Sequence, residues 1–178
     1  MSKSFADLGI KQPLQKSLSD LQLTVPTAIQ EKTLPLVLNQ SEDLVAIAKT
    51  GTGKTAAFGL PLVQLIDCKS SSVQAVVLVP TRELGHQIHA NLESYATHSP
   101  EVSIAALCGG IPVKPQIERL NGPTHIVVGT PGRLLDLIAR GALSLKQLKY
   151  LIVDEADEML TAFKADLERL IKELPKPY

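Results

Sequence analysis

The stretch Ala48-Lys-Thr-Gly-Thr-Gly-Lys-Thr55 decides how the fold of this chain is interpreted. An apolar run, Leu44-Val-Ala-Ile-Ala48, precedes it, and a run of helical character, Ala56-Ala-Phe-Gly-Leu60, follows it. We therefore expect a strand, a glycine-bearing loop and a helix start to meet here, as the phosphate-binding pattern G-x-x-x-x-G-K-[ST] requires. The first glycine of that pattern is Ala48 in this chain, so the loop depends on Gly51 and Gly53.

Each part of this loop has a chemical reason to bind a nucleotide. Backbone N–H groups can close around phosphate oxygens, and the helix N-terminus adds donors and a favourable dipole. Lys54 supplies a positive point charge, and the Thr55 hydroxyl suits a Mg²⁺ ion that bridges the β- and γ-phosphates. The alternative is a plain polar turn, which the flanking strand and helix disfavour. The loop residues predicted to bind nucleotide are Thr50, Gly51, Thr52, Gly53, Lys54 and Thr55.

Composition indicates an ordinary α/β protein of one domain, residues 1–178. The apolar fraction is 44% and the formal net charge is zero, so disorder is disfavoured and bulk charge gives no sign of a nucleic-acid partner. No apolar run has the length of a membrane span, and no signal-peptide core follows the N-terminus, so a cytoplasmic protein is expected.

The cysteines and histidines do not form a recognisable metal site. Cys68 and Cys108 lie far apart without a C-x-x-C pattern, and the four histidines lack metal-ligand spacing. We interpret them as packing or surface residues.

Strand-like and helix-like segments alternate along the chain. The expected strands are 44–48, 73–79, 102–107, 125–129 and 150–153, and the last is followed by one charged helix that runs to about residue 174. Such alternation predicts a mainly parallel sheet with helices on both faces and with ligands at the carboxyl ends of the strands. The lysine loop, 80–82, 109–110, 130–133 and 154–155 each follow a strand, so they should gather along one edge.

Asp154 and Glu155 follow an apolar strand, which is where a phosphate-loop ATPase places the acid that holds Mg²⁺. The adjacent carboxylate could activate water for attack on the γ-phosphate. Alternatively, these carboxylates cap the next helix. Their combination with the Lys54 loop favours the catalytic interpretation.

Arg82 and Arg133 each lie at an expected helix start, beside threonines and glycines that can offer hydroxyl and N–H groups to phosphate. This arrangement is typical of a track for a nucleic-acid backbone. A surface salt bridge is the alternative for either arginine alone. With only three Phe and three Tyr, the chain offers no aromatic platform for stacking bases.

Together these stretches resemble the first RecA-like domain of a DEAD-box ATP-dependent RNA helicase, which is a P-loop NTPase domain. The resemblance extends from Phe5 to about Leu174. It is carried by Pro26-Thr-Ala-Ile-Gln30, Pro80-Thr-Arg-Glu-Leu84, Gly109-Gly110, Thr130-Pro-Gly-Arg133 and Asp154-Glu-Ala-Asp157, in the family's order.

The resemblance implies a role for each motif. In the Q-motif region, residues 5–30, Gln30 would contact the adenine edge, Phe5 would pack near the ring and Thr27 would support the phosphate loop. Lys54 and Thr55 would serve phosphates and Mg²⁺, Asp154 would hold Mg²⁺ through water, Glu155 would position the hydrolytic water, and Asp157 would couple to a Ser-Ala-Thr motif that this chain lacks. The residues implied to contact RNA are Pro80, Thr81, Arg82, Gly109, Gly110, Thr130, Pro131, Gly132 and Arg133.

Three positions depart from the family's pattern. Gly85 stands where alanine is usual, which should loosen the helix start. Ala162-Phe163 replaces a frequent Gly-Phe turn, and Glu158 stands where arginine is common. These last changes question the conformation of that loop but do not touch the ATP site.

The sequence thus predicts a monomeric, ATP- and Mg²⁺-binding domain of an RNA helicase, with RNA and a second RecA-like domain, absent from this chain, as partners. A DNA-directed motor of the same superfamily is one alternative, because phosphate contacts do not distinguish the sugars. A non-catalytic scaffold or protein-binding domain is the other. The intact set Lys54, Thr55, Asp154 and Glu155 argues against a scaffold, which has no chemical need for it.

Overall fold

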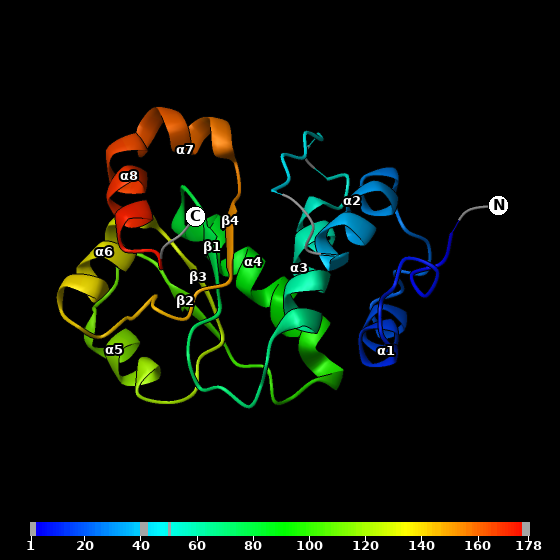
Figure 1. The fold of residues 1–178 in the computed structure, drawn as a ribbon, viewed down its shortest axis with the longest axis horizontal. Coiled ribbons are helices and arrows are strands. Elements are labelled where there is room, and N and C mark those ends of the chain that lie inside the picture. Colours follow the sequence, from blue (N-terminus) through cyan, green and yellow to red (C-terminus); the bar gives the residue numbers. More distant parts are fainter. Residues whose placement is uncertain (1–2, 40–42, 50, 176–178) are drawn as a thin grey trace. The chain divides into compact units, whose positions relative to one another are not determined.

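The computed structural model describes residues 3–39, 43–49 and 51–175 (Figure 1). The chain divides into two compact units. The helical unit is formed by Met1–Ile66 and Ala90–Glu101, and the sheet unit by Asp67–His89 and Val102–Tyr178. Among the described residues, no helix is both long enough and apolar enough to cross a membrane.

The helical unit contains α1 (Gln12–Asp20), α2 (Ala28–Asn39), α3 (Lys54–Leu65), the end of α4 (Arg82–Tyr95) and the short 3₁₀ helix η1 (Ala96–His98). Its buried leucines include Leu14, Leu18, Leu34, Leu60 and Leu92. Leu14 and Leu18 lie one turn apart in α1, and the other three come from α2, α3 and α4, so each of these helices contributes a buried apolar side chain.

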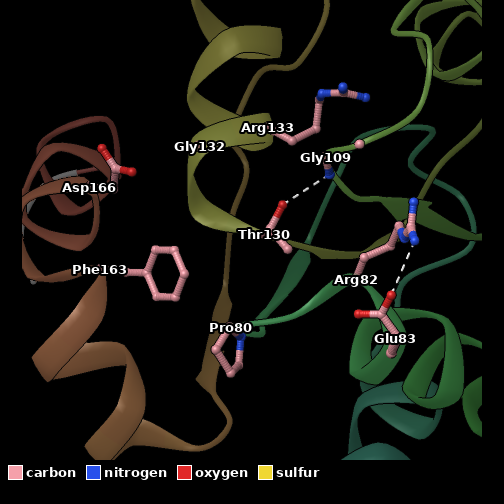
Figure 2. A pocket seen from close by; sticks show the side chains of 10 residues that line it. Pro80, Arg82, Glu83, Gly109, Thr130, Gly132, Arg133, Phe163 and Asp166 are labelled. Atoms are coloured by element: carbon pink, nitrogen blue, oxygen red, sulfur yellow. Dashed lines mark hydrogen bonds and ion pairs between the residues drawn. The ribbon is translucent and has the colours of Figure 1, made fainter.

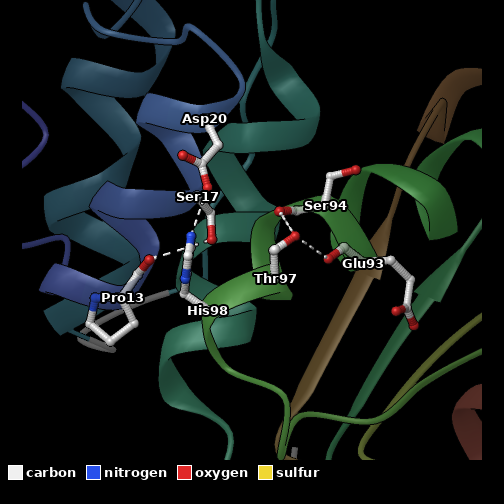
Figure 3. A network of polar contacts seen from close by, with 7 residues as sticks. All are labelled: Pro13, Ser17, Asp20, Glu93, Ser94, Thr97 and His98. Carbon is white, nitrogen blue, oxygen red and sulfur yellow. Dashed lines mark hydrogen bonds and ion pairs between the residues drawn. The ribbon is translucent and has the colours of Figure 1, made fainter.

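Polar contacts connect distant segments of this unit. The Gln64 side chain donates to the carbonyl of Gly9 (2.9 Å) and accepts from the N–H of Lys11 (2.8 Å), and so ties α3 to the segment before α1. His98 Nε2 lies 2.7 Å from an Asp20 carboxylate oxygen, which joins η1 to the end of α1 (Figure 3).

The sheet unit contains four parallel strands in the order β2-β3-β1-β4. Their bounds are β1 (Ala75–Leu78), β2 (Ile104–Leu107), β3 (Ile126–Gly129) and β4 (Tyr150–Val153). The helices are α5 (Lys114–Leu120), α6 (Pro131–Ala139), α7 (Ala156–Ala162) and α8 (Lys164–Lys172), together with the start of α4. The predicted α/β class and parallel sheet are confirmed.

The core of this unit follows from the apolar runs in the strands. Val76, Leu78, Ala105, Leu107 and Val127 point to one face and form a single buried cluster with side chains of α6, α7 and α8. Figure 1 shows α6 and α8 together beside this sheet. The alternate residues of the two central strands are also buried, as expected for parallel strands covered on both faces. In the edge strands, Ala106 of β2 and all four residues of β4 are only partly buried.

The expected strand at 44–48 is wrong. Residues 43–49 have no regular secondary structure, and the side chains of Val45 and Ile47 are 88% and 93% exposed. An apolar run becomes a strand only when a neighbouring strand accepts and donates its backbone hydrogen bonds. The described residues provide no such neighbour, because the four paired strands include none of 43–49.

The single helix expected after β4 is also wrong, because α7 and α8 are separate helices. They meet at Phe163, whose φ of −125° departs from helical geometry. The break allows Met159 of α7 and Leu167 of α8 to reach the same buried cluster.

Candidate nucleotide and nucleic-acid site

The phosphate loop has the backbone that its glycines predict. Gly51 and Gly53 adopt positive φ angles of 78° and 90°, a region that side chains other than glycine rarely enter. The Thr52 hydroxyl donates to the carbonyl of Lys49 (2.7 Å), which closes the turn. Thr50, also predicted to bind nucleotide, lies outside the described residues.

Lys54 and Thr55 are the first two residues of α3, and Gly53 is its N-cap. Both side chains are partly buried. The structure thus places the lysine and the threonine hydroxyl at a helix N-terminus, where backbone N–H groups favour an anion.

The Q-motif residues contact this loop. The Gln30 side chain accepts from the N–H of Thr27 (3.0 Å) and donates to the carbonyl of Gly53 (3.1 Å). A side chain at position 53 would collide with the Gln30 amide and approach the Thr27 hydroxyl to 3.2 Å. Gly53 is therefore required by packing as well as by its φ angle.

Phe5 is buried, with 6% of its surface exposed. Its carbonyl accepts from the N–H of Ile10 (3.0 Å) in the turn before α1. It belongs to the same helical unit as Gln30 and the loop.

The acidic turn follows β4 directly. The N–H of Asp154 donates to the carbonyl of Leu78 (3.0 Å), and an Asp154 carboxylate oxygen accepts from the N–H of Glu155 (3.0 Å). Glu155 has a φ of +48°, in the left-handed region that costs a residue with a side chain about 1–3 kcal/mol. Such strain collects at functional sites. Asp157 is exposed in the first turn of α7.

The segments that follow β1, β2 and β3 converge. Thr81 caps α4, since its hydroxyl accepts from the N–H of Leu84 (3.2 Å). The Thr130 hydroxyl accepts from the N–H of Gly109 (3.1 Å). A side chain at Gly110 would approach the Arg82 guanidinium to 3.1 Å, so the glycine leaves room for the arginine.

The two arginines differ in their partners. Arg82 forms an exposed ion pair with Glu83 (3.2 Å). The pKa of Glu83 lies below its ordinary value because the carboxylate accepts from its own backbone N–H and from Arg82. Arg133 donates to two neutral oxygens, Gln116 Oε1 and the carbonyl of Ile111, both at 2.8 Å.

These segments surround a pocket of about 600 Å³ (Figure 2). Its lining residues are Pro80, Arg82, Glu83, Gly109, Gly110, Thr130, Gly132, Arg133, Phe163 and Asp166. Seven of the nine residues predicted to contact RNA are in this set; Thr81 caps the adjoining helix and Pro131 begins α6. The structure thus brings the predicted backbone track together within one unit.

Sequence reasoning missed Phe163 and Asp166, which form the wall contributed by the junction of α7 and α8 (Figure 2). It also missed Gln116. One signal could have identified it: Gln116 falls on the apolar stripe of Val113, Ile117 and Leu120, where a polar side chain needs a partner.

The phosphate loop belongs to the helical unit, whereas the acidic turn and the pocket belong to the sheet unit. The gathering of all five segments at one edge therefore stays a prediction. Within the described residues, no group of three or more His, Cys, Asp or Glu side chains could hold a metal ion by itself.

Comparison with known proteins agrees with this site. Residues 27–178 match the DEAD/DEAH box helicase family. The chain is 46% identical to ATP-dependent RNA helicase CshA of Listeria monocytogenes over 174 residues, which covers 96% of this chain and 33% of the relative. It is 44% identical to ATP-dependent RNA helicase DeaD of Escherichia coli, with 97% and 28% covered.

Solved structures agree as well. A DEAD box protein from Methanococcus jannaschii superposes with a TM-score of 0.88 at 39% identity, covering 98% of this chain and 48% of that one. S. cerevisiae Dbp5 bound to RNA and ADP BeF3 gives 0.89 at 32% identity, with 98% and 44% covered. This chain belongs to the DEAD/DEAH box helicase family. It spans about a third of the length of the curated relatives it matches.

Proposed function

We propose that the chain is the ATP-binding half of an RNA-dependent ATPase that locally separates RNA duplexes by clamping one strand in a bent form. The convergence of Arg82, Arg133 and the Gly109–Gly110 segment on one pocket carries this proposal. The pocket lies where three parallel strands end, and its donors suit a phosphodiester backbone. The names of the relatives, ATP-dependent RNA helicases, support it.

The helical unit would bind the nucleotide. Gln30 would read the adenine edge beside Phe5, while Thr27 supports the loop. The loop residues Thr50, Gly51, Thr52 and Gly53 would cradle the phosphates. Lys54 would attract the phosphate charge, which it does in the ground state as well as in the transition state.

The acidic turn would serve hydrolysis. Carboxylate and hydroxyl oxygens are the ligands that Mg²⁺ prefers, so Asp154, through water, and Thr55 have the chemistry to hold it. The ion would offset charge on the phosphates. Glu155 would orient the attacking water, and Asp157 would couple hydrolysis to the rest of the enzyme. The hydrogen bond from the Glu155 N–H to Asp154 supports an oriented carboxylate at this position.

The sheet unit would hold one RNA strand. Arg82 and Arg133 would contact phosphates, the hydroxyls of Thr81 and Thr130 and the N–H groups near Gly109, Gly110 and Gly132 would add hydrogen bonds, and Pro80 and Pro131 would shape the track. These contacts carry no base information, so binding should tolerate many sequences.

A second RecA-like domain would complete the enzyme. One domain offers only one wall of the cleft, and an arginine finger contributes on the order of 10³ to 10⁵ in rate in related hydrolases. The coverage of only a third of the curated relatives is consistent with a further domain in such proteins. We include a monomeric state and a cytoplasmic location in the proposal.

A competition experiment tests the choice of nucleic acid. Labelled single-stranded RNA is bound to the protein with Mg²⁺ and a non-hydrolysable ATP analogue, and unlabelled RNA or DNA of matched sequence is then added. We expect RNA to compete at lower concentration. Equal competition would favour a DNA-directed motor, and no binding of either strand would favour a scaffold.

A further inference from the structure

Gln116 is a buried polar side chain in the sheet unit that no step above uses. It lies in α5, only 5% of its surface is exposed, and its neighbours on that face of the helix are apolar. A buried amide is unfavourable unless both its donor and its acceptor find partners. Its partners therefore explain why a glutamine can occupy this position.

Those partners come from two different motif segments. Gln116 Nε2 donates to the carbonyl of Cys108 (3.0 Å), the residue before Gly109-Gly110. Gln116 Oε1 accepts from Arg133 Nη1 (2.8 Å). One side chain thus joins the glycine segment after β2 to the arginine in the first turn of α6.

A second contact completes the arrangement. Arg133 Nη2 donates to the carbonyl of Ile111 (2.8 Å), just after the glycines. Each terminal nitrogen of the guanidinium therefore donates to a different oxygen. One acceptor, the carbonyl of Ile111, lies in the segment after β2, and the other belongs to Gln116, which is itself hydrogen-bonded to that segment. Both acceptors are neutral, so they orient the guanidinium without cancelling its charge.

This orientation has a consequence for affinity. A long side chain loses rotamer freedom when it binds, and a group that is already ordered loses less. Arginine also needs a defined plane to bind phosphate through two parallel hydrogen bonds. Arg82, by contrast, is exposed beside a carboxylate that competes for its charge.

We infer that Gln116 is a positioning residue for nucleic-acid binding: it fixes the Arg133 guanidinium and the Gly109–Gly110 segment so that both meet one phosphate track. The inference rests on the proposed function, because it assumes that Arg133 binds a phosphate. The inference goes further, because it assigns a role to Gln116 in α5, a helix outside the motif segments: Gln116 orients Arg133 for that phosphate contact.

Gln74 provides a matched control for a purely structural role. It is a buried glutamine of the same unit, 1% exposed. Its amide oxygen accepts from the N–H of Asp67 (3.0 Å) and from Lys149 Nζ (3.4 Å), and its amide nitrogen donates to the carbonyl of Asp67 (2.8 Å). It lies at the amino ends of the strands, away from the pocket. Gln116→Met and Gln74→Met remove similar hydrogen bonds at similar volume.

The experiment measures binding of a short oligouridylate RNA to the unaltered chain and to four variants over a series of KCl concentrations. The variants are Gln116→Met, Gln74→Met, Arg133→Gln and the double variant of Gln116→Met with Arg133→Gln. We expect both glutamine variants to melt earlier. Only Gln116→Met should weaken RNA binding, by roughly three- to tenfold, and lower the salt slope toward the loss of about 0.7 expected for one single-strand phosphate contact.

The double variant should lose less affinity than the two single losses combined, because part of the effect of Gln116 acts through Arg133 and part through the Gly109–Gly110 segment. If Arg133→Gln weakens binding and Gln116→Met does not, the inference is overturned while the proposed function stands. If Arg133→Gln itself changes nothing, the proposed phosphate contact fails and the inference fails with it.

A readout without RNA tests the positioning directly. In NMR spectra, the guanidinium N–H signals of Arg133 should exchange slowly with water in the unaltered chain and rapidly in Gln116→Met. Gln116→Glu keeps an acceptor for Arg133, so the slow signals should remain in that variant. Rapid exchange already in the unaltered chain would show that Arg133 is not held, and would overturn the inference.

Discussion

Gln30 donates a hydrogen bond of 3.1 Å to the carbonyl oxygen of Gly53, and so links α2 to the phosphate loop 23 residues later. Its amide oxygen accepts from the N–H of Thr27, and the side chain is 5% exposed. The residue proposed to read adenine is therefore also a support of the loop proposed to hold the phosphates. A base that binds Gln30 would therefore also affect the hydrogen bond that supports Gly53.

The first prediction concerns base selectivity. Gln30→Ala should reduce the preference for ADP over GDP, because a glutamine amide can pair with adenine as both donor and acceptor. It should also weaken both nucleotides, because the loop loses its contact at Gly53. Calorimetric titration with ADP and GDP measures both effects.

Gln64→Ala is the control for this prediction. Gln64 also makes two hydrogen bonds to backbone groups of the helical unit, those of Gly9 and Lys11, and neither of these bonds involves the loop or Thr27. It should lower the melting temperature and leave the ratio of the two affinities unchanged. A Gln30→Ala protein that discriminates as well as the unaltered chain would rule out the adenine-reading role.

The second prediction separates nucleotide binding from hydrolysis. Lys54→Ala should weaken ATP binding, because the lysine acts on ground-state phosphate charge at the start of α3. Glu155→Gln should bind ATP nearly as well and lose hydrolysis in the full-length protein, because its task arises when water attacks. Binding is measured by titration and turnover by phosphate release. Normal turnover of Glu155→Gln would show that the role of Glu155 is wrongly assigned.

The third prediction concerns the basic track. Arg82→Gln and Arg133→Gln should each weaken RNA binding about equally for all sequences, and each should lower the salt slope by about 0.7, since each removes one phosphate contact. Arg140→Gln is the control, because Arg140 is an exposed arginine paired with Asp136 on α6 and outside the pocket. A loss confined to particular RNA sequences would instead indicate base reading.

The fourth prediction reverses an expectation from helix propensity. Alanine at position 85 should favour the helix, yet a Cβ there would lie 2.5 Å from Cys108 Sγ and 3.3 Å from a Val79 methyl group. We expect Gly85→Ala to destabilise the protein by about 1–3 kcal/mol through overpacking. Denaturant unfolding measures this change.

Cys108→Ala should rescue Gly85→Ala, because it removes the atom in collision. Burial raises the pKa of the Cys108 thiol, so it is uncharged near neutral pH and the rescue tests volume and not charge. If the double variant is no more stable than Gly85→Ala alone, the steric explanation is incorrect.

The fifth prediction concerns the isolated chain. It should fold and bind nucleotide but show negligible RNA-stimulated ATPase and no unwinding, because one domain supplies neither the second wall of the cleft nor an arginine finger. Both activities should be present when a second RecA-like domain is joined to it. Efficient strand separation of a short RNA duplex by this 178-residue chain would refute the two-domain account.

The sequence by itself determined those strands and loop residues that a short run of residues, or a single residue, is enough to specify. Apolar runs predicted β1 to β4, because a buried parallel strand needs no more than such a run between turn signals. Gly51 and Gly53 were identified as loop glycines, since backbone freedom is a property of single residues. The order of the motifs was enough to indicate the family.

Tertiary structure decided whatever depends on a neighbour distant in sequence. Residues 44–48 have the composition of a strand, but no strand of the described sheet pairs with them, so they form no strand, and 44–47 are exposed. Helix propensity alone predicts that Gly85 weakens the start of α4, whereas the structure shows that Cys108 fills the space a side chain at position 85 would need. The positioning role inferred for Gln116 follows only from its hydrogen bonds to Arg133 and to the carbonyl of Cys108. Composition and spacing record what a residue can do, whereas pairing, packing volume and buried hydrogen bonds depend on which residues the fold places beside it.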